Sequence, residues 1–177
     1  MPFYMLPLIL TIMNQTPVFD FEPKSSLSDW TVVNDGVMGG LSQSTLKISD
    51  AGHGVFSGRV SLENNGGFAS IRLDCGRMSL QNAQNIVLKV KGDGKRYQCR
   101  IRARKSDYYS YVQYFETGTQ WEEISLPLRD FYPTFRGRKL NLPNFAADAL
   151  EEVGILIGNK RAERFELHID RIGLQGD

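Results

Sequence analysis

Arginines at alternate positions are the side chains of this sequence best suited to bind another molecule. Arg100, Arg102 and Arg104 lie in the segment KRYQCRIRAR. Successive side chains of a strand point to opposite faces, so this spacing predicts three guanidinium groups on one face of one strand. Each guanidinium is a rigid five-donor fork that fits carboxylates and backbone carbonyls. The alternative is an ordinary solvated face with neutralising neighbours such as Glu122.

Two further arginines are candidates for the same surface. Arg72 follows the apolar segment FASI, and Arg136 lies in the long segment 127–144. Together with Arg100 and Arg102 they predict a face fitted to an acidic or carbonyl-rich partner, such as a protein client.

Tyrosines accompany the arginines. Tyr109 and Tyr111 share one face of the next predicted strand, and Tyr108 and Tyr114 share the other. Aromatic rings stack on sugars, so a carbohydrate-binding module that uses this Arg/Tyr face is the alternative function.

The segment Asn34–Ser42, NDGVMGGLS, concentrates residues that favour unusual backbone conformations. One interpretation is a tight connection whose side chains bond their own backbone. The other is a surface rim for a ligand or partner, with Asn34, Asp35 and Ser42 as its binding residues.

Little in the composition suggests catalysis. The chain has two histidines, His53 and His168, and two cysteines, Cys75 and Cys99. No Ser-His-Asp arrangement or cysteine-built zinc site can be placed, and a Cys75–Cys99 disulfide is open but not indicated by the spacing. We therefore expect a protein that is not an enzyme and that needs no cofactor.

The 177 residues are 41% hydrophobic and 23% charged, with a net charge of +1. This balance indicates one globular domain and gives no overall attraction to nucleic acid.

An apolar run at residues 3–13 is too short to span a membrane. We expect residues 1–16 to be a leader or disordered arm, and residues 17–177 to form the domain. The leader is either untranslated, with the start at Met13, or a signal peptide, or an ordered arm. The location is then cytoplasmic, or secreted or periplasmic if the leader is a signal peptide.

Short alternating segments separated by turns run through the rest of the chain. They predict an all-β fold, an antiparallel β-sandwich of jelly-roll type with at most one short helix. That helix is expected at 145–152, capped by Asn144. The expected strands are 18–21, 30–33, 45–48, 54–60, 68–73, 86–91, 97–104, 108–115, 121–126, 153–157 and 165–172.

Four segments carry a family resemblance: WTVVNDGVMGGLS, FSGRVSLENNGGFASIR, KGDGKRYQCRIR and FRGR. They resemble the complex I intermediate-associated protein 30 family, and the resemblance covers residues 18–174. It implies a galactose-binding-like fold and a chaperone-like assembly factor whose clients are respiratory-complex subunits, without a catalytic site. The chain lacks a transit peptide rich in Arg and Ser and an attached nucleotide-binding fold, which predicts a free-standing bacterial-type member.

Galactose-binding-like modules often hold a structural calcium ion where the first and last strands meet. On that basis Asp20 and Glu22 near the first strand and Asp170 in the last are a candidate calcium site. Carboxylate oxygens are the ligands that Ca²⁺ prefers, while ordinary surface carboxylates are the alternative.

Overall fold

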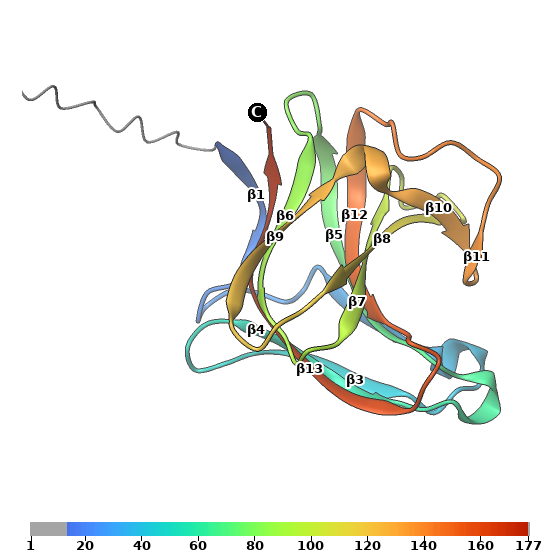
Figure 1. Cartoon of the computed structure of the whole chain (residues 1–177). Coiled ribbons are helices and arrows are strands. Elements are labelled where there is room, and N and C mark those ends of the chain that lie inside the picture. Colours follow the sequence, from blue (N-terminus) through green and yellow to red (C-terminus); the bar gives the residue numbers. More distant parts are fainter. Residues whose placement is uncertain (1–13, 177) are drawn as a thin grey trace, which may run out of the picture.

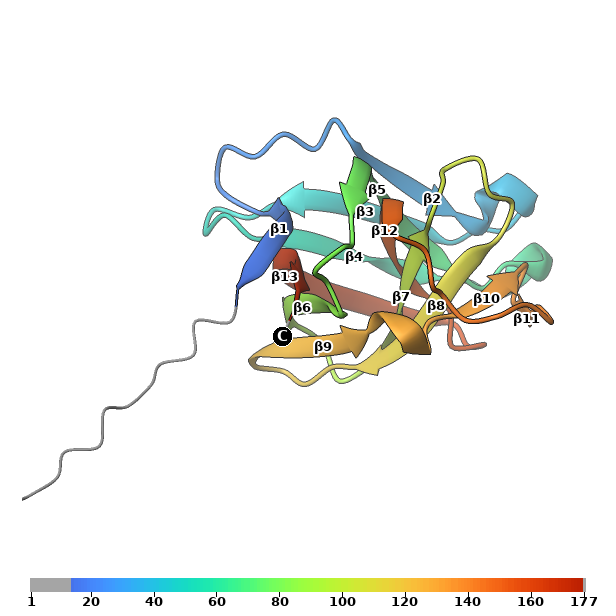
Figure 2. The ribbon, with the colours of Figure 1, turned by 90° about the horizontal axis from the view of Figure 1, so that it is seen from above.

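The computed structural model describes residues 14–176, and these form two antiparallel β-sheets packed face to face (Figures 1 and 2). This part of the chain contains thirteen strands and three short 3-10 turns, and no α-helix. The expected antiparallel β-sandwich is therefore confirmed. Most of the expected leader, residues 1–13, lies outside the described residues.

The first sheet has six strands in the order β3-β4-β13-β6-β9, with β1 added beside β13. Its long last strand pairs first with β4 and then with β1 along one side, and with β6 along the other. The strands are β1 (Gln15–Asp20), β3 (Gln43–Ile48), β4 (Gly54–Val60), β6 (Asn85–Lys91), β9 (Trp121–Pro127) and β13 (Glu163–Gln175).

The second sheet has seven strands in the order β11-β10-β8-β7-β12-β5-β2. Strand β12 lies between β5 and β7, although it comes long after both in the sequence. The strands are β2 (Trp30–Asn34), β5 (Ala69–Ser79), β7 (Arg96–Arg102), β8 (Ser110–Glu116), β10 (Tyr132–Phe135), β11 (Arg138–Lys139) and β12 (Ala149–Ile157). The turns are η1 (Asp35–Met38), η2 (Glu63–Asn65) and η3 (Leu128–Asp130).

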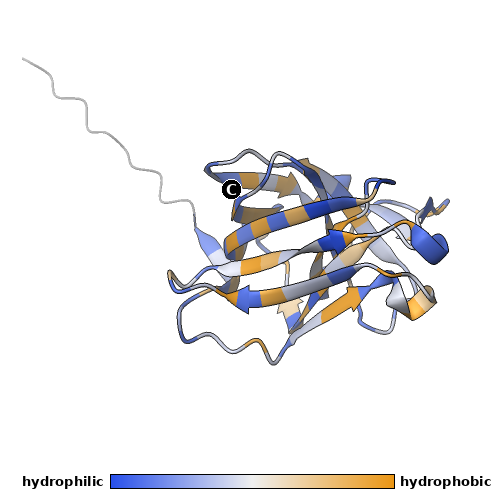
Figure 3. Ribbon diagram, turned by 90° about the horizontal axis from the view of Figure 1, so that it is seen from below, coloured by the Kyte–Doolittle hydropathy of each residue, from blue (hydrophilic) through white to orange (hydrophobic). Residues whose placement is uncertain are grey.

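The alternation expected in β7 builds the core. Tyr97, Cys99 and Ile101 are buried between the sheets, while Arg100 and Arg102 lie on the outer face. Figure 3 shows the same alternation of hydrophilic and hydrophobic residues along the strands of the six-stranded sheet. The two inner faces bury a continuous apolar cluster that fixes the register of every long strand.

The helix expected at 145–152 is wrong. Ala149–Ile157 forms β12, which pairs with β5 and β7 on its two sides, and residues 143–148 form a loop without helix. The segment AADALEE favours a helix locally, but Ala149 and Leu150 are buried as strand residues, continuous with the strand expected at 153–157. Pairing with two neighbouring strands thus overrides the local preference.

Two boundaries also differ from expectation. The segment 127–144 is not one long loop, because it contains η3 and the β10–β11 hairpin, whose turn holds Arg136. Strand β1 begins at Gln15, so the sheet starts two residues before the expected boundary at 17. Within residues 14–176 no helix is long and apolar enough to cross a membrane.

Candidate functional site

Three adjacent strands of the seven-stranded sheet carry the arginines. Gly154 of β12 pairs with Arg72 of β5 on one side and with Arg100 of β7 on the other. Two strand spacings separate Arg72 from Arg100, about 10 Å between their Cα atoms. Arg102 lies opposite Glu152 of β12. We call Arg72, Arg100 and Arg102 the arginine face; the structure brings these three expected residues together.

Arg100 is largely withdrawn from water and has few acceptors. Its Nη1 donates to Oε1 of Gln98 at 2.9 Å, and Nε2 of Gln98 donates to the Tyr114 hydroxyl at 3.0 Å. Within residues 14–176 its guanidinium makes no other hydrogen bond and no ion pair. Most of its five N–H donors are therefore available to a ligand.

Arg72 and Arg102 differ in how they are held. Nε of Arg102 donates to Oγ of Ser110 at 3.1 Å and lies 3.6 Å from Oε1 of Glu152. Arg72 makes no hydrogen bond or ion pair in the described part of the chain. Arg102 is thus anchored, whereas Arg72 has only the more distant charge of Glu152 to compensate it.

The electrostatics of the arginine face reflect this shortage of anions. Burial, with added repulsion from Arg72 and Arg102, lowers the pKa of Arg100 to about 10. Burial also lowers the pKa of Arg72, and the attraction of Glu152 only partly offsets it. Both groups keep their charge at neutral pH, so an incoming anion would relieve repulsion that the fold leaves in place.

The floor between the arginines is apolar and closely packed. Gly154 is buried, and a Cβ there would lie 2.7 Å from the carbonyl oxygen of Ile71. Val112 is buried beside Arg100, while the ring of Tyr114 is 38% exposed. Guanidinium donors above an apolar floor suit a planar carboxylate or carbonyl group, because low water access strengthens charged hydrogen bonds.

Asp35, expected at a surface rim, is instead fully buried. Its Oδ1 accepts the Ser42 backbone N–H at 2.9 Å, and its Oδ2 accepts the Ser42 hydroxyl. The backbone N–H groups of Gly67 and Phe68 donate to the same Oδ2 at 2.6 and 3.2 Å. Burial alone would raise the pKa of Asp35, but these hydrogen bonds outweigh it and lower the pKa.

The Asp35 carboxylate therefore joins two loops, 35–42 and 61–68; we call this the Asp35 knot. A Cβ on Gly40 would collide with the carboxylate, and one on Gly66 would lie 2.6 Å from Oδ2. Ser42, also buried, further accepts the N–H of Ser61 at 2.9 Å. The placement corrects the expectation of a rim: Asp35 and Ser42 have no surface to offer a ligand.

The other residues expected at the site are dispersed. Asn34 is half-buried and accepts the Ser44 hydroxyl at 2.7 Å, which ties β2 to β3. Arg136 is exposed in the β10–β11 turn at the far edge of the sheet, with its guanidinium 5.2 Å from the ring centroid of Phe135. Arg104 lies beyond the end of β7. None of these three belongs to the arginine face.

The placement of the carboxylates does not support the calcium hypothesis. Asp170 pairs with Lys89 at 3.2 Å and with His53 at 3.3 Å, while Asp20 and Glu22 are exposed. Among residues 14–176 no group of three His, Cys, Asp or Glu side chains could hold a metal ion.

The cysteines and histidines have local partners or apolar surroundings. Cys75 and Cys99 are both free thiols on β5 and β7, and β12 separates their strands. Burial raises the pKa of Cys75 to about 11 and that of Cys99 to about 12, so neither is an activated nucleophile at neutral pH. His168 pairs with Glu166 at 2.7 Å on an outer sheet face.

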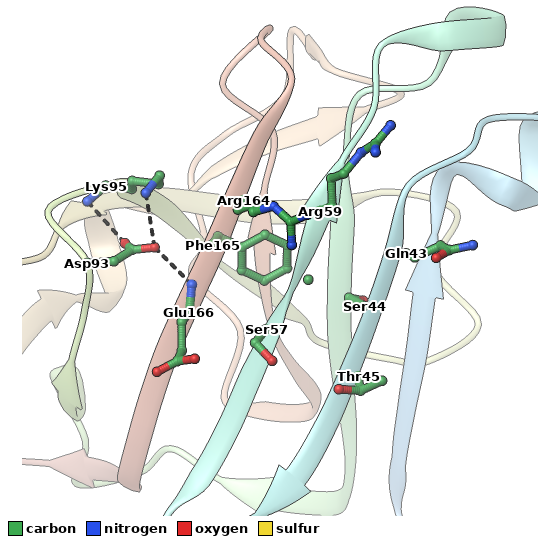
Figure 4. Close-up of a pocket in the computed structure, with 11 residues that line it drawn as sticks. Gln43, Ser44, Thr45, Ser57, Arg59, Asp93, Lys95, Arg164, Phe165 and Glu166 are labelled. Carbon is green, nitrogen blue, oxygen red and sulfur yellow. Dashed lines mark hydrogen bonds and ion pairs between the residues drawn. The ribbon is translucent and has the colours of Figure 1, made fainter.

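One surface feature was not anticipated from the sequence. A shallow hollow of about 680 Å³ crosses β3, β4 and β13 on the outer face of the six-stranded sheet. Figure 4 shows Arg59 and Arg164 on adjacent strands at this hollow, near the paired Lys95 and Asp93. Arg59 and Arg164 lie more than a hundred residues apart in the sequence, so no spacing signal connects them.

Comparison with known proteins identifies the family. Residues 19–169 match the family described as Complex I intermediate-associated protein 30 (CIA30). The chain belongs to this family. The resemblance seen in its motifs is thereby confirmed.

Two curated relatives are animal CIA30 proteins, both named "Complex I intermediate-associated protein 30, mitochondrial". The one from Drosophila melanogaster is 29% identical and covers 90% of this chain, and the one from Mus musculus is 28% identical and covers 97%. The chain spans 62% and 60% of the length of these relatives. Because both are mitochondrial proteins of animals, they give no support to the expectation of a bacterial member.

Solved structures with the same fold include carbohydrate-binding modules. The family 11 module of the Clostridium thermocellum cellulase Lic26A-Cel5E superposes with a TM-score of 0.68, 12% identity and coverage of 93% of this chain and 96% of that one. The same family's module in complex with a β-1,3-1,4-mixed-linked tetrasaccharide gives a TM-score of 0.66 at 14% identity, covering 92% and 95%. This likeness confirms the expected jelly-roll, galactose-binding-like sandwich.

Proposed function

We propose that this CIA30 chain is a non-catalytic, chaperone-like protein-binding module that associates with assembly intermediates of respiratory complex I. The names of its relatives support the choice of client. The observation that supports the binding surface is the pair of half-buried guanidinium groups, Arg72 and Arg100, flanking Gly154 with most of their donors unused.

The chemistry of this surface favours an acidic or carbonyl-rich polypeptide. An unassembled subunit exposes carboxylates and strand edges that later become buried in the complex. Arg72 and Arg100 can donate paired hydrogen bonds to such groups, and binding lowers the repulsion between the two cations. The relatives are named as mitochondrial proteins, and we place this activity inside mitochondria as well. In a cell without mitochondria we place it in the cytoplasm.

The test is affinity capture with the full chain from an extract of its host. Wild type should enrich complex I subunits. An Arg72→Met, Arg100→Met double variant should bind these subunits at least about tenfold more weakly, a loss of about 1.4 kcal/mol or more of binding free energy. Methionine keeps an apolar stem on the sheet, so the melting temperature should hold. An exposed Arg104→Met variant is the control. No enrichment by wild type, or equal capture by the double variant, contradicts the proposal.

A second candidate is carbohydrate binding on the same face. It is favoured by the partly exposed ring of Tyr114, whose hydroxyl accepts from Gln98 next to Arg100, because such a ring can stack on a sugar. Titration with a β-1,3-1,4-linked tetrasaccharide tests it. Binding that is lost in Tyr114→Ala supports this function, and no heat of binding at millimolar sugar excludes it.

A further inference from the structure

The turns η1 and η2 lie at the end of the sandwich opposite residues 14 and 176, the ends of the described chain (Figures 1 and 2), and four exposed aliphatic side chains lie in or next to these turns. Val37, Met38 and Leu41 are 73%, 55% and 51% exposed, and Leu62 is 45% exposed. We call these four residues the aliphatic tip. Exposed apolar side chains gathered in one place mark an interaction surface rather than ordinary scatter.

The aliphatic tip is held in place by the Asp35 knot. Leu41 immediately precedes Ser42, and Leu62 immediately follows Ser61, so the Ser42–Ser61 hydrogen bonds bring the two leucines to the same place. Asp35 fastens both loops at the base of η1. A partner therefore meets a preorganised surface and need not order these loops on binding.

Exposed cations lie at the same end of the fold. Arg59 pairs in register with Gln43, two residues after Leu41, and on its other side with Arg164. Figure 4 shows these two arginines side by side. Lys160 lies in the β12–β13 loop, where Gly158 packs against Gly67 of the knot.

These cations have no ion-pair partner within residues 14–176. Arg161, next to Lys160, is paired with Glu163 at 3.0 Å, and the exposed Glu63 beside Leu62 is the acid closest in sequence to the aliphatic tip. The margin of the tip thus carries more free positive than negative charge, although the whole chain is nearly neutral.

The residue types distinguish between a lipid and a protein partner. Centres of protein interfaces are rich in Trp, Tyr and Arg and poor in Leu and Val, and the tip contains no aromatic residue. Aliphatic side chains bordered by cations match a lipid surface, where the apolar groups enter the headgroup boundary and the cations meet phosphates.

We propose that the aliphatic tip docks this protein on an anionic lipid surface, with Arg59, Arg164 and Lys160 contacting lipid phosphates. This site is separate from the arginine face and does not depend on the proposed function. It also gives a physical reason for the NDGVMGGLS and NNGGF motifs: they build the Asp35 knot that presents the tip.

The test is co-sedimentation of the full chain with vesicles made from equal parts of phosphatidylcholine and phosphatidylglycerol. Wild type should bind, and a Val37→Ser, Met38→Ser variant should bind at least about tenfold more weakly, because it removes two inserted apolar side chains. Leu142→Ser, which changes an exposed leucine elsewhere, is the matched control and should bind as wild type does. Melting temperatures of both variants should match that of wild type.

The charge arm uses an Arg59→Gln, Arg164→Gln variant. It should weaken binding to the mixed vesicles by about tenfold and change binding to pure phosphatidylcholine much less. Failure of wild type to bind mixed vesicles overturns the proposal. So does unchanged binding by the Val37→Ser, Met38→Ser variant, which would assign attachment to another segment such as the apolar run 3–13. Loss of a protein partner, but not of vesicles, in that variant would make the tip a protein interface and would equally overturn it.

Discussion

Asp35 and Arg100 are both charged side chains withdrawn from water, but their surroundings differ. Asp35 accepts hydrogen bonds from Ser42, Gly67 and Phe68, and its carboxylate is fully compensated inside the fold. Arg100 donates one hydrogen bond, to Gln98, and faces two other arginines. A buried charge that is saturated stabilises the fold, whereas one that lacks partners costs stability and requires a reason outside the fold.

Among the substitutions that test this contrast, the one at Asp35 should change the free energy of unfolding most. Asp35→Ala leaves three backbone N–H groups without their acceptor, one buried at Ser42 and two half-buried at Gly67 and Phe68, and a buried donor without an acceptor costs about 1–3 kcal/mol. We expect the free energy of unfolding to drop by about 3 kcal/mol or more, measured by urea denaturation. Asp50→Ala, an exposed aspartate in the β3–β4 turn, is the control and should change it by less than about 0.5 kcal/mol. A small effect at Asp35 would mean that the knot is not what holds the loops.

Glycine substitutions test whether close packing of the loop against the Asp35 carboxylate is needed for stability. Gly40→Ala places a methyl group against the Asp35 carboxylate, whereas Gly36→Ala meets nothing within 4 Å. Gly40→Ala should cost about 1–3 kcal/mol, the usual range for overpacking. Gly36→Ala should be neutral or slightly stabilising. Equal effects at the two positions, measured by thermal unfolding, would show that contact with Asp35 is not the cause.

Acid unfolding tests the charge itself. The folded-state pKa of Asp35 lies below its ordinary value of 3.8, so the unfolded chain binds a proton more readily. Its contribution to stability is therefore complete above that ordinary pKa and disappears as the pH falls through the lower folded value. In Asp35→Asn the free energy of unfolding should fall less steeply as the pH decreases below the ordinary pKa of 3.8. Asp74, whose pKa is lowered chiefly by its hydrogen bond with Lys105, should supply part of the slope that remains.

The smallest expected effect is at Arg100. Arg100→Met removes a half-buried charge that repels Arg72 and Arg102 while keeping an apolar stem, so stability should stay within about 1 kcal/mol of wild type or rise. Arg102→Met should instead destabilise the fold, because it leaves the half-buried Glu152 without its partner. Urea denaturation of the two variants checks the contrast. A large loss at Arg100 would make it structural, like Asp35.

Much of this architecture could be predicted from local pattern. The alternation of Tyr97, Cys99 and Ile101 with the arginines indicated both a buried and an outer face of β7, because strand geometry alone decides it. The two-residue strand β11 and the Pro-containing β10 lacked that signal. Leu150 lies within a helix-favouring segment, and only its pairing with β5 made it a strand residue, whereas residues 153–157 were expected as a strand.

The candidate site was harder to predict, because its geometry depends on distant segments. No local pattern places β12 between Arg72 and Arg100, and that insertion sets their separation. Asp35 was noticed, but its direction was not, because two of its donors, Gly67 and Phe68, lie more than thirty residues away. The spacing of NDGVMGGLS is compatible with a rim and with a knot, and only the contact with the second loop decides between them.

The most direct test of the account is whether the arginine face binds carboxylates. Isothermal titration at low salt should show a hexaglutamate peptide binding to the full chain, with affinity that falls as salt rises, and a hexaglutamine peptide not binding. The Arg72→Met, Arg100→Met variant, still folded, should bind hexaglutamate at least about tenfold more weakly. Equal binding of both peptides, or undiminished binding by the variant, would contradict the claim that these two arginines keep their donors for an acidic partner.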